Sequence, residues 1–455
     1  MSRKVFSPGQ TLRQELEQIL GTEDLLTEVQ ELTGYEVEGL VPAMACFPRS
    51  SQQVAEILMS ANSHRSPVVP WGHGSKQHLG LPLKASGLLL SLARVSGPLE
   101  VEAANMTVRA RAGMGLKQLS QHLERHGLFL PLDPPDADSA TLGGCLAANS
   151  SGPRRLGYGT LRDMVLGVTV VLPTGQMIHS GGSTMKDVAG YSLRRMFIGS
   201  WGTLGIMTEA TLRLLPLPES RCTLAIRSND CGSLLQVMAR IRASSWLPAA
   251  AELIGPGTGH EGVLGLKPGQ WLLLLQLEAM SEVVQRQSRE TTAAATDSGI
   301  ADITRLQGQE MESIWQSYRR WWQRLETQPS AVRLKVSLLF TRQDEWLHQA
   351  SDICLETGLA MRLVAHIGDG ILYPHLLPGN PAQEETLQPA VEQLGQLTTR
   401  LGGFQMVEVA PRWLRKRVQL LPHRGDYPLM KKLKASLDPD NLLNPGRVLG
   451  ASASE

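Results

Sequence analysis

The chain is poor in cysteine, and the cysteines that it has form no recognisable pair. Among 455 residues there are five, scattered at Cys46, Cys145, Cys222, Cys231 and Cys354. Their number is odd, and none stands in a C-x-x-C motif. This pattern argues against a disulfide framework and against an iron–sulfur cluster held by this chain. It is typical of a cytosolic protein with reduced thiols.

Long apolar runs are also absent. The first residues, MSRKVFSPGQTLRQELEQIL, lack the continuous apolar stretch of a secretory signal. The run QWLLLLQLEAM, residues 270–280, is too short to span a membrane and is interpreted as a buried strand. We therefore expect no transmembrane segment and a cytoplasmic protein. Attachment to the inner face of the membrane through partners is the other option.

No sign of charge dominates the chain. Lysine and arginine together number 44 and the acidic residues 43, so the formal net charge is +1. This balance gives no support to a nucleic-acid partner. The most basic cluster, RWLRKRVQLLPHR at 412–424, is interpreted as a solvated helix face, and a docking face for a partner is the alternative.

A chain of this length is too long for one ordinary core, and two or three domains are expected. The first half predicts a helix over about 10–33, a second helix at 50–63 and then short strands, which together give an α+β domain that closes near residue 218. The second half restarts with a β-α-β-β-α-β succession, which predicts a ferredoxin-like split βαβ sheet. No internal sequence repeat is visible.

One Gly-rich stretch follows a short apolar strand. It reads PVVPWGHGSKQHLG, residues 67–80. Gly72, Gly74, Ser75 and Lys76 could form a nest of backbone N–H groups around an anion. The Walker motif does not fit, because Ser75 stands where that motif has lysine, and the dinucleotide fingerprint lacks its third glycine at Gln77. This loop alone could be an ordinary turn.

Two further Gly-rich elements follow in order. They are LPLDPPDADSATLGGCLAANSSGPRRLGYGTLRDMV at 130–165 and MKDVAGYSLRRMFIGSWGTLGIMTEATLRLLP at 185–216. The succession P-x-G-x-G-S, then D-P-P…T-L-G-G…A-N-x-S-G, then K-D-V-A-G-Y…G-S-x-G-T-L-G-I-x-T-E-A resembles the FAD-linked oxidases of the vanillyl-alcohol oxidase (PCMH) type. The resemblance is closest to the flavoprotein subunits of glycolate oxidase and to D-lactate dehydrogenases. It covers about 40–218 and the end LDPDNLLNPGRVL closely, and 219–330 only in outline.

The resemblance implies an α+β architecture with a two-subdomain PCMH-type FAD-binding domain, a ferredoxin-like split βαβ cap domain and a C-terminal helix. The expected divisions are an N-terminal helical segment at 1–37, the FAD-binding domain at 38–218, the FAD-linked oxidase C-terminal (substrate or cap) domain at 219–425, and a tail at 426–455 that returns to the FAD domain.

The resemblance also implies where FAD is held. The loop at 70–76 wraps the pyrophosphate, the stretch at 139–152 closes from the other side, and residues 204–208 border the adenosine half. Lys186 and Asp187 lie where the family's chain passes near the flavin. The residues implied to contact FAD are Pro70, Trp71, Gly72, His73, Gly74, Ser75, Lys76, Pro134, Thr141, Gly143, Gly144, Asn149, Ser150, Gly152, Gly205, Ile206 and Asn444.

Some relatives tether the flavin to a histidine at the end of the first loop. Here that place is Ser75 or Lys76, and His73 and His78 lie about two or three positions away. We therefore expect non-covalent FAD, and we interpret both histidines as polar residues of a surface loop.

The catalytic motifs of the family are incomplete in this chain. The 2-hydroxy-acid dehydrogenases carry H-x-G-D-G-N-L-H and, further on, E-H-G, in which two histidines and the glutamate hold a metal and the last histidine is the candidate base. This chain has HIGDGILYP, so His366 matches, but Ile371 and Tyr373 replace the asparagine and the second histidine. Glu408 stands near the family glutamate, and Val409 replaces the base. No metal is expected.

An anionic 2-hydroxy acid needs a cation, and arginine can bind a carboxylate through two hydrogen bonds. Arg333, Lys335 and Arg319 are the candidates, each with an ordinary ion pair as the alternative. Trp315, Trp321 and Trp322 are interpreted as core packing rather than a flavin stack. With His366 and Glu408, the three cations complete the predicted catalytic set.

The resemblance implies a FAD-dependent oxidoreductase, or a subunit of one, of the glycolate or D-lactate dehydrogenase type. It would oxidise a small 2-hydroxy acid and pass electrons to an iron–sulfur partner, beside a related flavoprotein subunit. The alternative is an FAD-bearing accessory subunit without a complete catalytic site. The incomplete motifs, and Trp201 where the catalytic type usually has glutamate, favour the alternative. The chain length and the retained Gly368-Asp369-Gly370 favour the first hypothesis.

Overall fold

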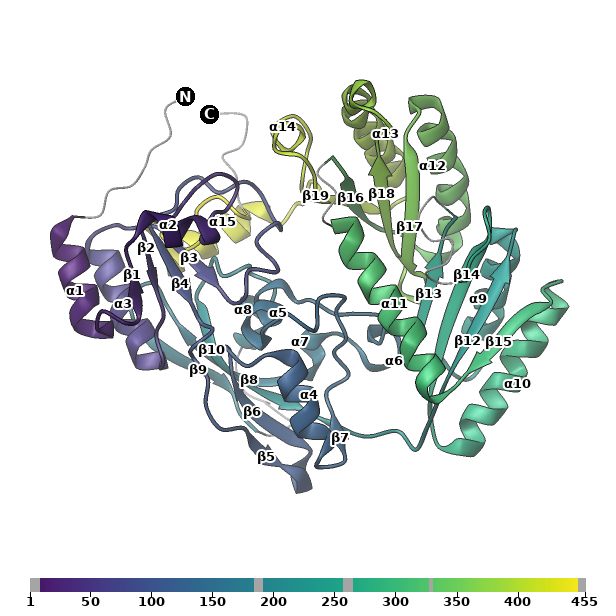
Figure 1. Ribbon diagram of the computed structural model, residues 1–455, viewed down its shortest axis with the longest axis horizontal. Helices are drawn as coiled ribbons and strands as arrows, with labels where there is room; N and C mark the ends of the chain where they lie inside the picture. Colours follow the sequence, from purple (N-terminus) through teal and green to yellow (C-terminus); the bar gives the residue numbers. More distant parts are fainter. Residues whose placement is uncertain (1–8, 184–190, 257–264, 327–329, 449–455) are drawn as a thin grey trace.

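Two domains lie side by side, and the chain passes from the first to the second and then returns (Figure 1). The structure is a computed structural model that describes residues 9–183, 191–256, 265–326 and 330–448. The first domain comprises residues up to 216 together with the last helix and the segment after it. The second domain extends from residue 220 to about 415. Among the described residues, no helix is both long and apolar enough to cross a membrane.

The first domain opens with a four-stranded sheet in the order β1-β2-β4-β3. Strands β2, β3 and β4 are parallel, and β1 is antiparallel to β2. The apolar faces of helices α1 and α3 form one core with this sheet. Helix α3 begins where the Ser50 side chain accepts a hydrogen bond from the Gln53 backbone N–H. The elements are α1 (Gln10–Leu20), β1 (Leu25–Leu26), α2 (Val29–Leu32), the 3₁₀ helix η1 (Thr33–Tyr35), β2 (Met44–Cys46), α3 (Ser51–Ser63), β3 (Val68–Trp71) and β4 (Leu88–Ser91).

A second, antiparallel sheet in the order β5-β6-β10-β8-β9 completes the first domain. Strands β8 and β9 form an antiparallel pair at one edge of this sheet. A two-stranded piece, β11-β7, lies beside the sheet. The elements are β5 (Glu100–Glu102), η2 (Ala103–Asn105), β6 (Thr107–Arg111), α4 (Leu116–Glu124), β7 (Leu128–Phe129), α5 (Leu142–Ala148), α6 (Arg155–Tyr158), α7 (Leu161–Met164), β8 (Val165–Val171), β9 (Met177–Gly181), α8 (Arg194–Phe197), β10 (Ile206–Arg213) and β11 (Leu215–Pro216).

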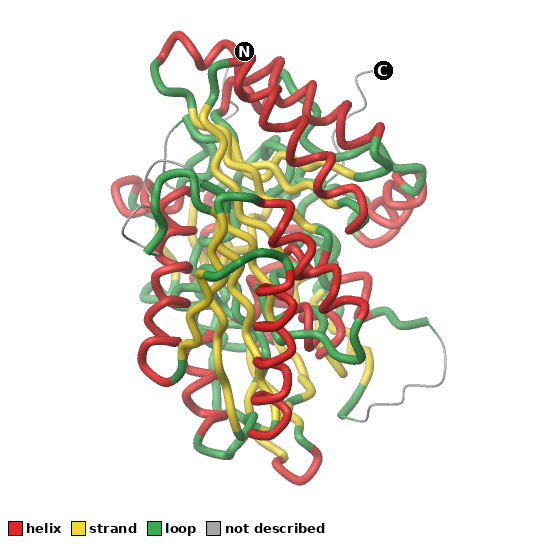
Figure 2. The backbone as a smooth tube through the Cα atoms, turned by 90° about the vertical axis from the view of Figure 1, so that its right-hand side faces the viewer, coloured by secondary structure: helices red, strands yellow, loops and turns green. Residues whose placement is uncertain are grey.

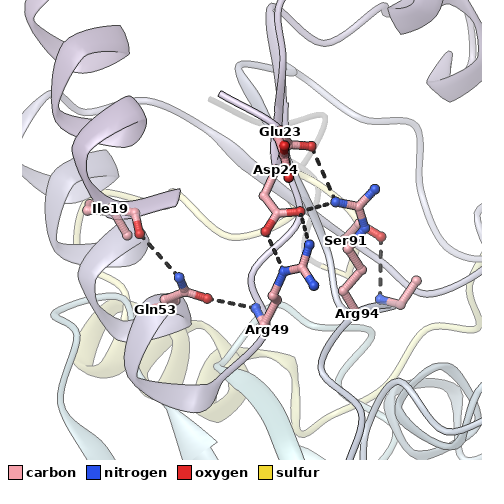
Figure 3. A network of polar contacts seen from close by, with 8 residues as sticks. Ile19, Glu23, Asp24, Arg49, Gln53, Ser91 and Arg94 are labelled. Carbon is pink, nitrogen blue, oxygen red and sulfur yellow. Dashed lines mark hydrogen bonds and ion pairs between the residues drawn. The ribbon is translucent and has the colours of Figure 1, made fainter. Parts of the chain in front are cut away.

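A buried carboxylate joins the first helix to the small sheet (Figure 3). Asp24 accepts hydrogen bonds from Arg49 Nε at 2.6 Å and Arg49 Nη2 at 3.0 Å, and it also pairs with Arg94. Arg94 donates to the Glu23 carbonyl at 3.3 Å. The Arg49 guanidinium is the main reason that the pKa of Asp24 lies below its ordinary value. Asp24 thus connects the turn after α1 to the segments before α3 and after β4.

The predicted long helix over 10–33 is wrong. Helix α1 ends at Leu20, because Gly21 adopts φ 74° and the Gly21 backbone N–H bonds the Glu17 carbonyl. The chain then extends so that Leu25 and Leu26 pair with β2. Apolar residues continue at helical spacing beyond Gly21, but the pairing of β1 with β2 determines the structure there.

The second domain contains one eight-stranded sheet in the order β15-β12-β14-β13-β17-β18-β16-β19. It consists of two βαββαβ halves with the same internal strand order, joined where β13 pairs antiparallel with β17. A ferredoxin-like split βαβ sheet is therefore present twice. The elements are β12 (Ser220–Ser228), α9 (Cys231–Ala243), β13 (Ala250–Ile254), β14 (Trp271–Ala279), α10 (Ser281–Asp297), β15 (Asp302–Leu306), α11 (Gly308–Glu326), β16 (Val332–Ser337), η3 (Phe340–Arg342), α12 (Gln343–Thr357), β17 (Ala360–His366), η4 (Ile367–Asp369), β18 (Ile371–Leu377), η5 (Pro381–Thr386), α13 (Leu387–Arg400) and β19 (Phe404–Val409).

The two faces of this sheet have different partners. On one face, alternate strand residues such as Leu334 and Ala365 share a core with helices α9, α10, α12 and α13. Figure 2 looks at the molecule from the side of the second domain, and the strands run next to one another with helices over them. On the other face, α11 packs against the residues between, among them Val364 and Tyr373. Because side chains alternate along a strand, the polar residues on this second face point away from the helical core.

The end of the chain returns to the first domain. After α14 (Arg412–Arg415), helix α15 (Tyr427–Leu437) lies against it, and Leu443 forms a parallel bridge with Val68 of β3. The Asn444 backbone N–H donates to the Val68 carbonyl at 2.9 Å. Residues near Val68 and residues more than 300 positions later in the chain thus lie side by side in the first domain.

Candidate functional site

A cleft of about 800 Å³ runs through the first domain, between its two sheets and under the returning chain end. No aspartate or glutamate is among its described lining residues. They are Pro70, Trp71, Gly72, His73, Gly74, Ser75, Lys76, Gln77, Leu79, Leu92, Thr141, Gly143, Gly144, Ala147, Ala148, Trp201, Gly202, Gly205, Ile206, Met207, Asn444 and Arg447.

The loop after β3 presents its backbone to this cleft. Within the described part of the chain, the N–H groups of residues 72–76 donate no hydrogen bond, and the pattern resumes where Gln77 N–H bonds the Gly74 carbonyl at 3.3 Å. A Cβ at Gly72 would collide with the Thr141 hydroxyl. Gly74 has φ +81°, and a Cβ there would lie 2.9 Å from Cε2 of the Trp71 indole. Both positions therefore require glycine, and the loop is shaped as a nest for an anion.

The opposite wall is built by α5 and by the chain end. Thr141 caps α5 by accepting a hydrogen bond from Gly144 N–H at 3.2 Å. Asn444 Nδ2 donates to the Trp201 carbonyl at 2.6 Å, and Arg447 Nη2 donates to the Gln77 carbonyl at 2.7 Å. The buried Asn444 Oδ1 has no partner within the described chain. These features fit FAD: a long cleft, a row of free N–H groups for its phosphates, and no lining carboxylate to repel them.

A second cleft of about 650 Å³ continues from the first, and Ser75, Lys76, Leu79 and Ala148 line both. It lies between the two domains. Its other described lining residues are His78, Pro135, Asp136, Asn149, Ser150, Ser151, Arg155, Trp322, Arg333, Lys335, His366, Tyr373 and Glu408.

Strand β16 supplies two cations to this cleft. Arg333 Nε lies 3.0 Å from Glu408 Oε2, and Lys335 Nζ lies 4.0 Å from Glu408 Oε1. Arg333 Nη2 also contacts His78 Nε2 at 3.1 Å. The nearby Tyr373 hydrogen-bonds Lys335, and the electrostatic interaction with this tyrosine is the main reason that the pKa of Lys335 is raised. One carboxylate is thus shared by two cations.

His366 stands at the joint between the two halves of the sheet. Its Nδ1 lies 2.5 Å from Oε1 of Glu252, its partner across the β13–β17 pair, and Tyr318 donates to Glu252 Oε2 at 2.6 Å. Burial is the main reason that the pKa of Glu252 is raised. The Trp322 ring is parallel to the imidazole at 6.2 Å between centroids. The His366 imidazole is therefore held at one edge by Glu252 and covered on one face by Trp322.

Two further ion pairs border the second cleft, one within the first domain and one between the two domains. Lys76 pairs with Asp136. Arg155 Nε lies 3.6 Å from Asp369 Oδ2, and burial is the main reason that the pKa of Asp369 is raised. The lining therefore contains four cationic side chains, those of Lys76, Arg155, Arg333 and Lys335, and two carboxylates, those of Asp136 and Glu408.

Within the described ranges, no group of three or more histidine, cysteine, aspartate or glutamate side chains lies close enough to hold a metal. Glu408 is engaged by Arg333 and Lys335, and the Tyr373 ring packs edge-on against the His366 imidazole at 5.2 Å between centroids. The expectation that no metal binds stays a prediction.

The predicted site residues fall into three groups. The first cleft contains all residues predicted at 70–76, and also Thr141, Gly143, Gly144, Gly205, Ile206 and Asn444. Asn149, Ser150, Arg333, Lys335, His366 and Glu408 line the second cleft instead. Pro134, Gly152 and Arg319 are not among the described lining residues of either cleft. Lys186 and Asp187 lie outside the described residues.

The structure corrects two interpretations made from the sequence. His78 is half-buried in the second cleft rather than on a surface loop, and burial, aided by the nearby Arg333, lowers its pKa to about 3. Trp322 lines that cleft in addition to packing in the core, whereas Trp315 and Trp321 are buried core residues.

Sequence reasoning missed Glu252, Tyr318, Arg155, Trp201 as a cleft residue, and Arg447. Glu252 had one available signal. In AAELI it is the single charged residue of an apolar strand, and such a residue needs a partner.

Comparisons with known proteins show similarity in sequence and in fold. Residues 42–181 match the family model described as "FAD binding domain", and residues 217–448 match "FAD linked oxidases, C-terminal domain". The glycolate oxidase subunit GlcD of Bacillus subtilis is 29% identical over 91% of this chain and 90% of its own length. The D-lactate dehydrogenase of Archaeoglobus fulgidus is 30% identical over 88% and 90%. A structure of p-cresol methylhydroxylase with bound substrate superposes with a TM-score of 0.78 at 17% identity, covering 96% of each chain.

The fold combines a FAD-binding domain with the C-terminal domain of FAD-linked oxidases. The chain belongs to the FAD-linked oxidases. It is a FAD-dependent oxidoreductase, and FAD is its cofactor.

Proposed function

We propose that this chain oxidises a small 2-hydroxy acid to the 2-oxo acid and passes the electrons to an iron–sulfur partner. The observation that carries this proposal is the second cleft, which continues from the FAD cleft and is lined by four cations against two carboxylates. An anionic substrate suits that surplus of positive charge. The names of the two curated relatives, which concern glycolate and D-lactate, support the same substrate class.

Each lining side chain has a role in this reaction. When bound, FAD supplies the hydride acceptor. Lys335 and Arg333 hold the carboxylate of the acid beside Glu408. His366, whose Nδ1 is held by Glu252, accepts the hydroxyl proton at Nε2. Trp322 and Tyr373 form the aromatic wall that limits access of water.

The iron–sulfur partner is proposed because the described residues offer no cluster site. A reduced flavin must pass on two electrons, and metal clusters accept them one at a time. The five cysteines are scattered along the chain, and within the described residues no group of three or more histidine, cysteine, aspartate or glutamate side chains lies together. A cluster would therefore lie on another chain. Gentle isolation from native cells, followed by iron analysis of the co-purified proteins, tests this point. Rapid oxygen consumption by the isolated chain would instead indicate a self-sufficient oxidase.

A second candidate function is an accessory FAD subunit. It is favoured by Ile371, Tyr373 and Val409, which replace three residues of the family's catalytic motifs.

Anaerobic mixing of the FAD-loaded chain with 2-hydroxy acids distinguishes the two functions. Loss of the flavin absorbance near 450 nm is expected with one class of acid, at a rate that saturates with concentration. An oxidised spectrum that persists with every acid, while FAD stays bound, would contradict the enzyme hypothesis and support the accessory role.

A further inference from the structure

Positive charge is concentrated on the segment that leads from the second domain back to the first. Asp426 is the only carboxylate between residues 411 and 437, and lysine and arginine recur throughout this stretch. The whole chain, by contrast, has a formal net charge of +1. The segment begins with α14, which stands at the top of the junction between the two domains in Figure 1.

Three cations around α14 face solvent. Arg412, Lys416 and Arg417 are exposed, and among the described residues none of the three forms an ion pair. Arg417 lies over the Trp413 ring, 5.5 Å from its centroid. Arg412 and Lys416 are one helical turn apart and Arg417 follows directly, so the three charges lie close together. We call these three residues the cationic face. Such a concentration of one charge sign attracts a surface of the opposite sign.

The helix that carries the cationic face is fixed to both domains. Leu414 is fully buried in the helical core of the second domain. The neighbouring Arg415 points the other way: its guanidinium donates to the His78 carbonyl at 3.2 Å and also to the Gly80 carbonyl, and it pairs with Glu38 at 3.2 Å. His78 and Gly80 directly follow the loop at 70–76. The cationic face therefore has a defined position relative to the loop that we expect to hold FAD.

A third cleft, of about 860 Å³, opens beside this segment. The segment contributes Leu421, Pro422 and Tyr427 to its wall, and no carboxylate is among the described lining residues. Phe404, on the opposite wall, is 59% exposed. Trp201 lines both this cleft and the first cleft. An apolar passage therefore connects the surface next to the cationic face with the cofactor cleft.

Trp201 is held firmly at the boundary between these two clefts. Its φ of 53° lies in the left-handed region, which is uncommon for a bulky residue and persists only where the surroundings enforce it. The Trp201 N–H donates to the Ala147 carbonyl at 2.9 Å, and the Trp201 carbonyl accepts from Asn444. A Cβ at Gly80 would lie 2.8 Å from the indole, so the ring packs directly on this glycine.

Resting on the proposed function, we propose that the iron–sulfur partner docks an acidic surface on the cationic face and covers the mouth of the third cleft. Phe404 and Tyr427 then contribute to the apolar centre of the interface, and Arg412, Lys416 and Arg417 to its charged rim. Electrons leave the flavin past Trp201. Oxidation of the reduced flavin releases two electrons and two protons. Two one-electron centres take one electron each, and the protons pass to water.

Electron transfer to carriers of opposite charge tests the surface without any substrate. The flavin of the FAD-loaded protein is reduced by light in the presence of EDTA and then mixed with an oxidised carrier. Plastocyanin, an acidic copper protein, is the probe, and the basic cytochrome c is its counterpart. At about 20 mM sodium chloride, plastocyanin is expected to reoxidise the flavin at least tenfold faster than cytochrome c does. At about 300 mM salt most of this advantage should be lost.

Reversal of charge on the cationic face should change the order of the two carriers. Arg412→Glu/Lys416→Glu is expected to slow the reaction with plastocyanin at least tenfold and to accelerate the reaction with cytochrome c. Lys117→Glu/Arg125→Glu makes the same change of charge at exposed positions of α4 and is the matched control, with both rates within twofold of the unmodified protein. Should the glutamate variant not fold, Arg412→Gln/Lys416→Gln is expected to slow plastocyanin about threefold.

The partner itself is tested by gentle isolation from native cells. The iron that co-purifies with the unmodified chain should fall at least fivefold with Arg412→Glu/Lys416→Glu and remain with the α4 control. Unchanged iron in the first variant, or equal rates with the two carriers, would overturn the proposal. So would a variant that loses binding to phosphatidylglycerol vesicles while both carrier rates stay unchanged, since the face would then serve a membrane.

Photoreduction separates this proposal from the proposed function, because it needs no 2-hydroxy acid. If no acid reduces the flavin but the carrier rates follow the charges as expected, the substrate reaction is wrong and the docking surface stands. If an acid reduces the flavin and Arg412→Glu/Lys416→Glu leaves both carrier rates unchanged, the docking surface is wrong and the oxidation of 2-hydroxy acids stands.

Discussion

At the scale of single residues, Gly74 determines the shape of the loop at 70–76, where we expect FAD to bind. Its φ of +81° is costly for any side chain, and a Cβ there meets the Trp71 indole within the protein itself. Gly74→Val is therefore expected to distort the loop and to lower the FAD content of the purified protein at least tenfold, measured from absorbance at 450 nm against protein concentration. Gly127→Ala has a similar φ of +69° and open space around it, so it should retain FAD. Full FAD in Gly74→Val would show that the loop does not hold the cofactor.

Glu408 is the common counter-ion of two cations. Because Arg333 and Glu408 are both buried, replacing the carboxylate removes a buried counter-ion that lies 3.0 Å from the guanidinium. Glu408→Gln is expected to lower the free energy of unfolding by about 3 kcal/mol. A substrate-like anion should then stabilise the variant more than the unmodified protein, which melting temperatures with and without the acid can measure. An equal ligand-induced shift in both proteins would argue that the anion binds elsewhere.

The sequence revealed the site unevenly, for reasons visible at particular residues. The glycines of the first loop could be placed because a turn of that shape limits the choice of residue. Arg333 and Lys335 could be paired because alternation in VRLKVS puts them on one face of a strand. Glu252 could not be linked to His366, because 114 positions separate them and local spacing carries no information about the β13–β17 pairing.

At the scale of elements, the fold was predictable where patterns are local. The strands β4, β6, β10 and β14 and the helices α3, α4, α10 and α13 follow local apolar patterns, and α3 also begins at a capping serine, Ser50. The first helix was predicted too long because Gly21 and the pairing of β1 with β2 end it. The two-fold repetition of the βαββαβ unit could not be recognised in the sequence. Two segments can share a topology when their patterns of buried residues are alike, even though the residues themselves differ.

The loop after β3 also predicts how the flavin is held. Neither Ser75 nor Lys76, at its end, offers an imidazole, and His73 is engaged through Nδ1 with the Ser139 carbonyl at 2.9 Å. Precipitation with acid is expected to release all flavin as FAD into the supernatant, where fluorescence and chromatography quantify it. Flavin that remains with the polypeptide pellet, and maps to a peptide containing His73 or His78, would contradict non-covalent binding.

Asp24 makes the junction of α1, α3 and β4 sensitive to acid. Its pKa is lowered in the folded protein, chiefly by the hydrogen bond from Arg49. This stabilisation is therefore fully present above the ordinary aspartate pKa of about 4 and is lost as the pH falls through the lower folded value. Both guanidinium groups are partly exposed, so Asp24→Asn should cost about 1–2 kcal/mol at pH 7.

Urea unfolding at a series of pH values checks this expectation. The difference between Asp24→Asn and the unmodified protein should be constant from pH 7 to pH 5 and should shrink below pH 4. Asp440→Asn, which affects a more exposed carboxylate 3.8 Å from Arg65, is the matched control and should change stability little. A difference that grows towards acid pH would contradict the assignment.

At the scale of the whole molecule, the returning chain end forms part of the wall of the first cleft, where we expect FAD to bind. Arg447 is 2% exposed and bonds the Gln77 and Leu81 carbonyls and Glu38. Arg447→Met is expected to weaken FAD binding at least tenfold, because the Gln77 and Leu81 carbonyls, at the end of the first loop, lose these hydrogen bonds. Equilibrium titration of the apoprotein with FAD measures the effect. Arg65→Met, on the exposed side of the same domain, should bind FAD normally.

The return of the chain end also has a consequence for the order of synthesis. Arg447 and Gln77 are 370 positions apart, and Asn444 closes the cleft from the same end. A ribosome therefore releases the loop at 70–76 long before the residues at 444–447. The cap domain is synthesised in between, while the first cleft still lacks one wall. We expect flavin to bind only after residues 444–447 have emerged, so that cofactor loading follows the synthesis of both domains.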